Sequence, residues 1–460
     1  MTQPSVRNGD AALDALREVE RELDRRWPET RIEPSLTRIA ALADLLGSPQ
    51  RAYPVLHVAG TNGKTSVAWM LDALLSRVGL RVGRYTSPHL QQVTERISVD
   101  GAPISPQRYV DAYHDIEPYV ALVDAGSPVR MSKFEVLTGM AFATFADAPV
   151  DAAVVEVGLG GSWDATNVAD ATVAAITPIA VDHVNYLGSN ITGIAAEKAG
   201  IIKPDSVAVL AQQPPEVARV LAARSIEVGA TVAREGIEFG VLHRDIAVGG
   251  QQLKLQGLGG VYDEIFLPLH GPHQARNAVL ALATAEAFFG AGGNLSLDIE
   301  AVRDAFATVS APGRLERVRT APSVFLDGAH NPHGAQALAS ALREEFAFRR
   351  LVAVVGVMRD KDARGILAEL EPVVDEVILT GSGSPRAMGI DDLTAAAQEV
   401  FDDSRLRVVA RLPDAIEVAI DSATDAADPD SAGISGIGVI ITGSVAMVGA
   451  ARTLFGRDPQ

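Results

Sequence analysis

The sequence contains no cysteine. The protein therefore cannot form a disulfide bond, use a thiolate as a nucleophile, or hold zinc or an iron–sulfur cluster through sulfur. Basic side chains are also in the minority, because 40 Lys and Arg stand against 58 Asp and Glu and give a net charge of −18. A chain this acidic lacks the positive surface on which nucleic-acid binding depends, so nucleic acid is not an expected partner.

The first residues lack a secretion or transit signal, because acidic side chains are interleaved with arginines there. One uncharged stretch, residues 431–451, is long enough to span a membrane. Glycines interrupt this stretch, and the break at residues 442–444 favours a buried strand that leads into a helix. We therefore expect a cytoplasmic protein that has no membrane partner.

The remaining composition, with 47% hydrophobic and 21% charged residues, is that of a folded protein. At roughly 100 to 200 residues per domain, a chain of 460 residues predicts two or three domains. The alternation of strands and helices restarts at Ala311-Pro312-Gly313. We therefore predict an N-terminal domain over residues 1–310 and a C-terminal α/β domain over residues 311–460.

The N-terminal part begins its regular pattern with a strand at 54–59, a glycine loop and a helix from Lys64. Apolar runs at 152–157 and 171–176 are typical of buried parallel strands. Glycine pairs within residues 231–269 predict antiparallel strands at the margin of the sheet. The other predicted elements are a helix at 274–289, strands near 324–326, 351–355, 377–379, 408–410 and 439–441, and an Asp/Ala-rich surface loop at 421–433.

The glycine loop at residues 60–66, Gly-Thr-Asn-Gly-Lys-Thr-Ser, carries the clearest chemistry. Between a strand and a helix, backbone N–H groups and the helix dipole converge on an anion. Lys64 would reach the terminal phosphates of a nucleotide, and the Thr65 hydroxyl would hold magnesium. The loop is shorter than the usual GxxxxGK[ST] motif, because Ala59 lies four residues before Gly63.

This shortened P-loop resembles that of the Mur ligase superfamily, and further motifs narrow the resemblance to the folylpolyglutamate synthase/dihydrofolate synthase family. The resemblance extends over residues 54–449. It rests on residues 57–66, 85–90, 156–161, 164–167, 182–183, 187–188, 197–201, 273–278, 312–316 and 327–332, which occur in this order on one chain.

The resemblance implies an α/β protein with a P-loop Mur-ligase-like central domain, a mostly parallel sheet, and a smaller Rossmann-like C-terminal domain. It also implies an ATP-dependent carboxylate–amine ligase, in which a carboxylate attacks the γ-phosphate and the amine of L-glutamate displaces phosphate from the acyl phosphate. The expected substrates are dihydropteroate, which gives dihydrofolate, and tetrahydrofolate species, which give folylpolyglutamates. Because members of this family are usually monomers, the resemblance also implies a monomer.

The same resemblance assigns Thr65, Ser87, Glu156 and His183 to Mg2+, with two ions expected. Oxygen ligands suit this ion, and Glu156 would be costly to bury at the end of an apolar strand without a cation. A histidine alone is more often a packed core side chain, so the assignment of His183 depends on the family pattern. Lys198 is implied to be carbamylated, which would replace a cation by an oxygen-bearing anion near the second ion.

Both domains supply the nucleotide-binding and catalytic residues that the resemblance implies. Asn277 can offer a donor and an acceptor to adenine, and Arg314 suits a phosphate. Asp327 is assigned to the ribose or the lysine network, and His330 to the glutamate or its amine proton. The cofactor-binding set is Asn62, Gly63, Lys64, Thr65, Asn277, Arg314 and Asp327, and the catalytic set is Lys64, Lys198, Asp327 and His330.

The pterin pocket of the family matches Phe134, as a stacking surface, and Asp164, as a carboxylate for the donor pair at N3 and the 2-amino group. Glu135, Trp163 and Ala165 complete the substrate-binding set. Where the family usually has arginine after the double glycine, this chain has Ser162.

Three alternative functions stay open at this point. The protein could have the polyglutamate activity alone, act as a Mur ligase on a nucleotide-linked cell-wall peptide, or hydrolyse ATP as a regulatory protein without forming a bond. The segment at residues 86–90 and the pterin-type residues favour the folate family over the cell-wall ligases. The sequence leaves open the length of the glutamate chain and the preferred folate.

Overall fold

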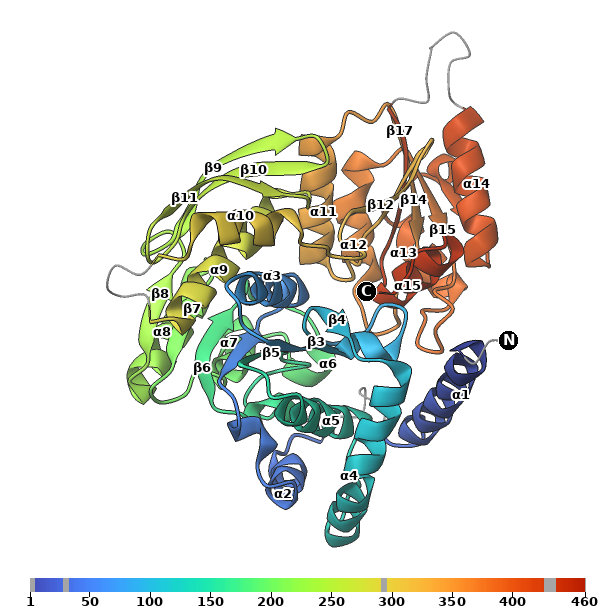
Figure 1. Cartoon of the computed structure of the whole chain (residues 1–460). Helices are drawn as coiled ribbons and strands as arrows, with labels where there is room; N and C mark the ends of the chain where they lie inside the picture. The colour runs from blue at the N-terminus through green and yellow to red at the C-terminus, as the bar shows by residue number, and fades with distance from the viewer. Residues whose placement is uncertain (1–4, 28–32, 291–295, 426–435, 460) are drawn as a thin grey trace.

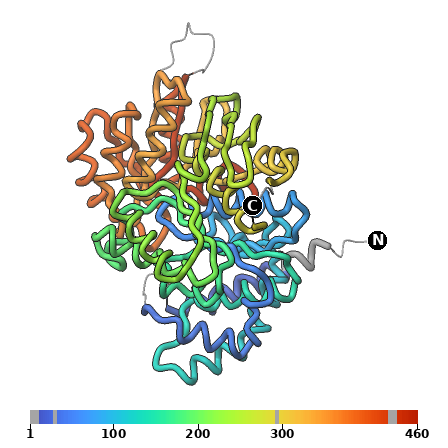
Figure 2. The backbone as a smooth tube through the Cα atoms, turned by 90° about the vertical axis from the view of Figure 1, so that its left-hand side faces the viewer, coloured from blue at the N-terminus to red at the C-terminus, as the bar shows by residue number. Residues whose placement is uncertain are grey.

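The computed structural model describes residues 5–27, 33–290, 296–425 and 436–459. These residues form sheets of eight, three and six strands, and helices pack against the two larger sheets (Figure 1). The six-stranded sheet and the three-stranded sheet lie side by side at one end of the molecule, above the eight-stranded sheet (Figure 2). The predicted α/β class with a mostly parallel sheet and a smaller C-terminal α/β domain is confirmed.

The eight-stranded sheet has the order β4-β3-β2-β5-β1-β6-β7-β8 and is parallel from β2 to β8. Its central strand, β1, has all five residues buried, as expected for a parallel strand covered on both faces. The strands are β1 Val55–Ala59, β2 Val82–Tyr85, β3 Ile97–Val99, β4 Ala102–Pro103, β5 Ala152–Glu156, β6 Ala171–Ile176, β7 Val207–Leu210 and β8 Thr231–Arg234.

Alternate residues of β1 point to opposite layers of helices. Leu56 and Val58 pack in the core with α3, α9 and α10, whereas Val55 packs in the core with α4 and α5. This alternation is that of a strand whose two faces are both covered. The helices are α1 Ser5–Asp24, α2 Thr37–Leu45, α3 Lys64–Arg77, α4 Pro106–Gly126, α5 Lys133–Asp147, α6 Val184–Leu187, α7 Ile191–Ala199, α8 Pro215–Val228, α9 Pro272–Phe288 and α10 Ile299–Ala307.

The region at 231–269 differs from its prediction in part. β8 is a parallel edge strand of the large sheet, paired with β7. β9 Gly240–Ala247, β10 Gly250–Gln256 and β11 Val261–Leu267 are antiparallel as predicted, but they form a separate sheet. This sheet is separate because Leu253 and Leu255 of β10 bury their side chains in the core that includes α3 and α9, not along the edge of β8.

The C-terminal sheet has the order β12-β13-β17-β14-β15-β16, and only β12 runs antiparallel to its neighbour. The predicted strand at 408–410 is misplaced by two residues, because β15 pairs with residues 406–408. β12 was not predicted, since its sequence Glu-Arg-Val-Arg-Thr buries only Val318. The strands are β12 Glu316–Thr320, β13 Ser323–Leu326, β14 Arg350–Val355, β15 Glu376–Leu379, β16 Leu406–Val408 and β17 Ile437–Thr442.

The uncharged stretch at 431–451 contains β17, which is wholly buried, and then α15, as predicted. No helix in the described part of the chain is long and apolar enough to cross a membrane. The predicted surface loop at 421–433 begins too early, because α14 continues to Asp425 and buries Ala423; residues 426–433 lie outside the described residues. The helices here are α11 Pro332–Glu345, α12 Ala363–Leu370, α13 Ile390–Gln398, α14 Leu412–Asp425 and α15 Val445–Leu454.

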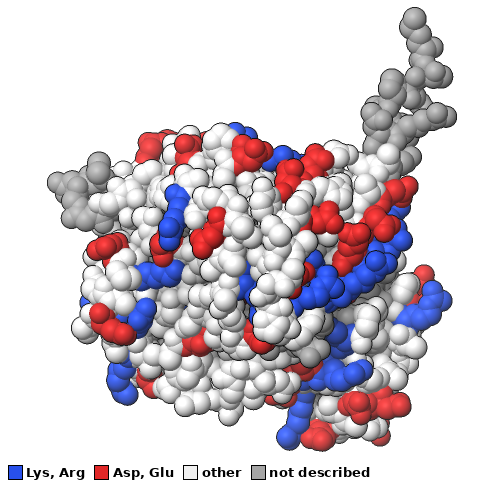
Figure 3. Space-filling view, turned by 90° about the horizontal axis from the view of Figure 1, so that it is seen from below, with Lys and Arg blue, Asp and Glu red and all other residues white. Residues whose placement is uncertain are grey.

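Charges of both signs are mixed on the face seen from below (Figure 3), where basic side chains lie beside acidic ones. The expectation that nucleic acid is not a partner, which rests on the net charge of −18, stays a prediction.

Candidate active site

A cavity of about 1240 Å³ lies where the N-terminal and C-terminal parts of the chain meet. Its wall includes the P-loop and Glu156 from the first part, and Asp327, His330 and Ser444 from the second. Small-molecule pockets usually measure roughly 300 to 1,000 Å³. The cavity therefore has room for a nucleotide together with a second substrate.

Two glycines give the P-loop its shape. Gly60 (φ +145°) lies so close to Thr177 that an added Cβ would be 1.8 Å from Thr177 Oγ1. Gly63 (φ +90°) lies against Asn277, whose Oδ1 would be 2.6 Å from an added Cβ. Lys64 folds back over the loop and donates to the carbonyl oxygens of Gly60 (3.3 Å) and Thr61 (3.2 Å). The loop thus keeps its lysine at the cavity wall and its backbone close to Asn277.

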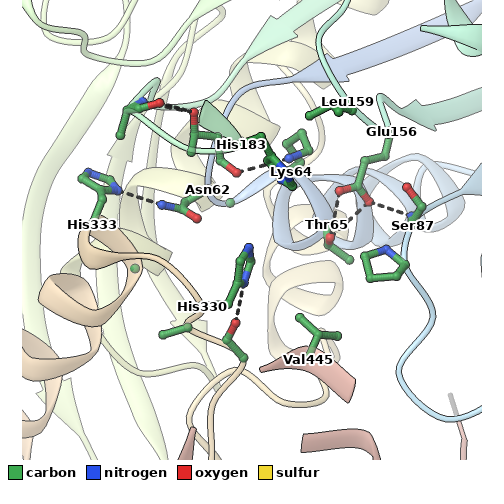
Figure 4. Close-up of a pocket in the computed structure, with 18 of the residues that line it drawn as sticks. Asn62, Lys64, Thr65, Ser87, Glu156, Leu159, His183, His330, His333 and Val445 are labelled. Carbon is green, nitrogen blue, oxygen red and sulfur yellow. Dashed lines mark hydrogen bonds between the residues drawn. The ribbon is translucent and has the colours of Figure 1, made fainter. Parts of the chain in front are cut away.

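Glu156 ends β5 and is only 1% exposed. Thr65 Oγ1 donates to its two carboxylate oxygens at 3.0 and 3.1 Å, and the backbone N–H of Ser87 donates at 3.3 Å (Figure 4). Burial raises the pKa of Glu156, and the Lys64 ammonium opposes that rise. The carboxylate and the hydroxyl groups of these neighbours are the hard oxygen donors that magnesium prefers.

His183 lies on the other side of Lys64 from Glu156 (Figure 4). Its Nε2 is 3.4 Å from Lys361 Nζ and 3.8 Å from Asp182 Oδ2. Burial, with the charge of Lys361, lowers the pKa of His183 to about 3, so the imidazole is neutral at neutral pH. The predicted magnesium residues thus occupy two places, and no group of three or more His, Asp or Glu side chains suited to a metal occurs among the described residues.

Lys198 lies near the end of α7 and is 4% exposed. Among the residues that the structure describes, no hydrogen-bond or ion-pair partner is found for its Nζ. Burial, together with the charge of Lys64, lowers the pKa of Lys198 to about 7. A substantial fraction of this amine is therefore neutral near pH 7, which is the form that reacts with carbon dioxide.

Ser162, at the position where the resemblance implies an arginine, joins the loop after β5 to α7. Its backbone N–H and its hydroxyl both donate to the carbonyl oxygen of Glu197, at 2.9 and 3.0 Å. The contact is close enough that a Cβ at Gly200 would lie 2.1 Å from Ser162 Oγ. A longer side chain such as arginine would have to point away from this contact. Ser162 therefore links the loop after β5 to α7 through its hydrogen bonds to Glu197.

Hydrogen bonds connect the P-loop directly to the C-terminal part of the chain. The amides of Asn62 and Asn331 donate to each other, at 3.1 and 3.0 Å, and Asn62 Nδ2 is also 2.9 Å from His333 Nδ1 (Figure 4). Asn331 Nδ2 donates to Asp182 Oδ2 at 2.8 Å, and Lys361 Nζ donates to Asp182 Oδ1 at 2.6 Å. The described conformation therefore has its two parts in contact around the nucleotide loop.

Asp327 and His330 follow β13 and face the cavity from the C-terminal side. Asp327 accepts hydrogen bonds from the backbone N–H groups of Leu315 and Ala329, at 2.9 and 2.8 Å. Burial raises its pKa, and Arg314 opposes the rise. The Nδ1 of His330 is 2.8 Å from the carbonyl oxygen of Gly328 and must donate to it, so its Nε2 carries the lone pair. Burial lowers the pKa of His330 to about 4.

Phe134 and Asp164 lie on the same cavity wall. The Phe134 ring lies against Gly158, where an added Cβ would be 2.5 Å from the ring edge. Glu135 does not offer a free carboxylate, because Arg38 Nε (3.0 Å) and the Ser132 N–H (2.7 Å) both donate to it. Trp163 and Ala165 line the same cavity.

Sequence reasoning did not assign a role to Lys361, Asn331 or His333, although all three contact predicted site residues. Asn331 lies inside a motif used for the resemblance, so that motif was the available signal. The side chain of Lys361 reaches Asp182 across 179 positions in the sequence. No local pattern could have indicated that contact.

Two family models match the chain: the Mur ligase middle domain over residues 128–285 and the Mur ligase glutamate ligase domain over residues 313–438. The chain is 62% identical to the dihydrofolate synthase/folylpolyglutamate synthase of Mycobacterium tuberculosis over 464 aligned residues, which cover 97% of this chain and 95% of that protein. It is 34% identical to the protein of the same name from Bacillus subtilis, over 80% and 85% of the two chains.

Solved structures agree with these matches. The Mycobacterium tuberculosis folylpolyglutamate synthase complexed with ADP has a TM-score of 0.93 and 62% identity, covering 98% of this chain and all of the other. The Escherichia coli FolC in complex with DHPP and ADP has a TM-score of 0.79 and 30% identity, covering 92% and 94%. With a P-loop, a buried glutamate and a glutamate ligase domain around one cavity, the chain belongs to the dihydrofolate synthase/folylpolyglutamate synthase family of Mur ligases.

Proposed function

We propose that this ATP-dependent ligase adds L-glutamate both to dihydropteroate and to reduced folates, through an acyl phosphate. The observation that carries the proposal is the single cavity lined by the P-loop, by Phe134 and Asp164, and by Asp327 and His330. A nucleotide, a pterin-bearing acid and an amino acid would each find a chemically suitable wall there. The polyglutamate activity alone is the second candidate.

In the nucleotide subsite, the backbone of Asn62 and Gly63 would surround the phosphates, and Lys64 would leave its two carbonyl partners to contact them. Asn277, held beside Gly63, would recognise the adenine, as the resemblance implies. Arg314 would contact a phosphate from the C-terminal side.

Magnesium fits the residues present, because Glu156 is a buried carboxylate whose pKa burial raises, and a bound cation would stabilise its charge. Thr65, Ser87 and Glu156 would hold one ion. The neutral His183 and a carbamylated Lys198 would hold a second. When bound, the metal would neutralise charge on the transferred phosphoryl group.

On the C-terminal side, the lone pair on His330 Nε2 would accept a hydrogen bond from the amine of L-glutamate. Asp327 holds the loop that carries His330 through its bonds to backbone N–H groups.

In the pterin subsite, Asp164 would accept hydrogen bonds from the paired N–H donors of the pterin. Phe134 and Trp163 would supply ring surfaces for stacking, and Ala165 would supply a small apolar contact. Glu135 would act indirectly, by fixing the start of α5.

Mass spectrometry of products tests the proposal directly. With ATP, magnesium, L-glutamate and dihydropteroate we expect dihydrofolate, and with tetrahydrofolate we expect added glutamate residues. Products from tetrahydrofolate alone would leave the polyglutamate activity only. Phosphate release that needs neither pterin nor glutamate would instead support a regulatory ATPase, and turnover of a UDP-linked peptide would support a cell-wall ligase.

We further propose that the protein acts as a monomer in the cytoplasm.

We propose a domain boundary at residue 311, and the support for it is that the three-stranded sheet ends with β11 before this residue and the six-stranded sheet begins with β12 after it. Limited proteolysis tests it, with cleavage expected near residue 311 and two stable fragments on either side of it.

A further inference from the structure

A buried chain of hydrogen bonds leads from β1 to Asp164. His57 is fully buried in the centre of β1, and its Nε2 lies 2.9 Å from Thr166 Oγ1. Thr166 is also fully buried, and its hydroxyl is hydrogen-bonded to Asp164 Oδ1. Asp164 lines the cavity, whereas His57 and Thr166 lie behind the wall. The two hidden residues can therefore act on a ligand only through Asp164.

The direction of this chain follows from counting protons. The Thr166 hydroxyl has one proton, and an ionised Asp164 can only accept it. The Thr166 oxygen then accepts from His57, which must carry its proton on Nε2. The opposite direction would need a protonated Asp164 and would leave an N–H on His57 Nδ1, a buried atom that has no partner among the described residues. Buried N–H groups without an acceptor are rarer than acceptors without a donor.

Two other bonds hold the Asp164 carboxylate in place and cannot reverse. The backbone N–H of Leu159 donates to Oδ2 at 2.9 Å, and the backbone N–H of Thr166 donates to Oδ1 at 3.0 Å. The Thr166 hydroxyl is the one reversible contact among these, so the histidine behind it decides whether it donates to Asp164 or accepts from it.

We propose that His57 is a positioning residue that, through Thr166, keeps Asp164 ionised, so that the lone pairs left free by its internal hydrogen bonds form a charged acceptor for the N–H donors of the ligand. This inference rests on the proposed function, in which Asp164 binds the pterin edge. A neutral Asp164, with its proton donated to Thr166, would be a weaker acceptor for the same donors.

Two amide substitutions separate the two ring nitrogens of His57. Glutamine places an amide N–H near the position of Nε2, whereas asparagine places it near Nδ1, which has no partner. We expect His57→Asn and Thr166→Val to raise the KM for dihydropteroate and tetrahydrofolate about tenfold, with the KM for ATP changed by less than about twofold. His57→Gln and Thr166→Ser should recover most of the loss.

Thermal melting of each variant shows whether the fold is retained. Equal losses in His57→Gln and His57→Asn, or an equal rise in the KM for ATP, would overturn the inference. Asp164→Asn separates this inference from the proposed function. If that variant leaves the KM for both pterin substrates unchanged, the pterin role of Asp164 fails and the inference with it. If it raises this KM while His57→Asn does not, only the role of His57 fails.

Discussion

Replacing Lys361 with methionine would leave Asp182 as a buried carboxylate without its cation. The two side chains are each 7% exposed, and their charged atoms are 2.6 Å apart. Removing one partner of a buried ion pair costs about 3 to 5 kcal/mol. Because Lys361 and Asp182 belong to different parts of the chain, we expect the cost to fall on the contact between the parts and not on either core. A loss of about 3 kcal/mol corresponds to a fall in kcat of more than a hundredfold if that contact is needed for turnover.

The assay is steady-state turnover with ATP, tetrahydrofolate and L-glutamate, alongside small-angle scattering with an ATP analogue and folate. Arg364→Met is the matched control, because this arginine is 68% exposed and its ion pair with Glu399 lies on the surface. Adding Asp182→Asn to Lys361→Met should recover part of the loss, since the unpaired charge is removed. Turnover like that of the control, with no change in the radius of gyration, would refute this reasoning.

The other predictions concern the P-loop, the metal, the pterin subsite and pH. Lys64→Ala should abolish turnover with little change in melting temperature, because the hydrogen bonds that the structure describes for Lys64 Nζ go to carbonyl oxygens of its own loop; product formation measured against a melting curve checks both. Glu156→Gln should raise the magnesium concentration needed for half-maximal activity, and an unchanged magnesium titration would remove Glu156 from the metal site. Asp164→Ala should reduce ligation of dihydropteroate more than extension of tetrahydrofolate, by roughly ten to a hundredfold in kcat/KM, because dihydropteroate has no glutamate tail; equal losses would contradict this. Burial lowers the pKa of His57 to about 3, below the value of 6.5 in the unfolded chain. Between these two values only the unfolded state binds the proton, so the folded protein loses stability as the pH falls from 6.5 toward 3. Denaturant titrations should therefore show that His57→Gln loses less stability than wild type between pH 7 and pH 5, by about 2 kcal/mol.

The parts of the fold that follow from local patterns could be predicted from the sequence. β1, the P-loop and α3 form one continuous signal of apolar strand, glycines and helical spacing. The edge strand β12 gave no such signal, because it is charged and buries a single side chain. The separate β9–β11 sheet depends on burial against α9, which is a contact between segments distant in sequence.

The candidate site likewise has residues that local motifs predict and contacts that arise only from the folded chain. Thr65, Ser87 and Glu156 lie together as the motifs indicated, since they lie at or just beyond the carboxyl ends of the neighbouring parallel strands β1, β2 and β5. The reach of Lys361 to Asp182 and the capture of Glu135 by Arg38 depend on side chains that meet only after folding. A motif identifies a residue, but the packing of the folded chain decides which side chain pairs with its charge.

The mutual amide pair between Asn62 and Asn331 has a thermodynamic consequence. A phosphate that reorients Asn62 changes the strength of its hydrogen bonds to Asn331 in the C-terminal part. The free energy of nucleotide binding is therefore coupled to the free energy of docking between the two parts. Reciprocity then requires that a substrate which strengthens docking also changes the affinity for the nucleotide by the same factor. An amide pair of this kind links the affinities of ligands that bind on the two parts, whichever ligand binds first.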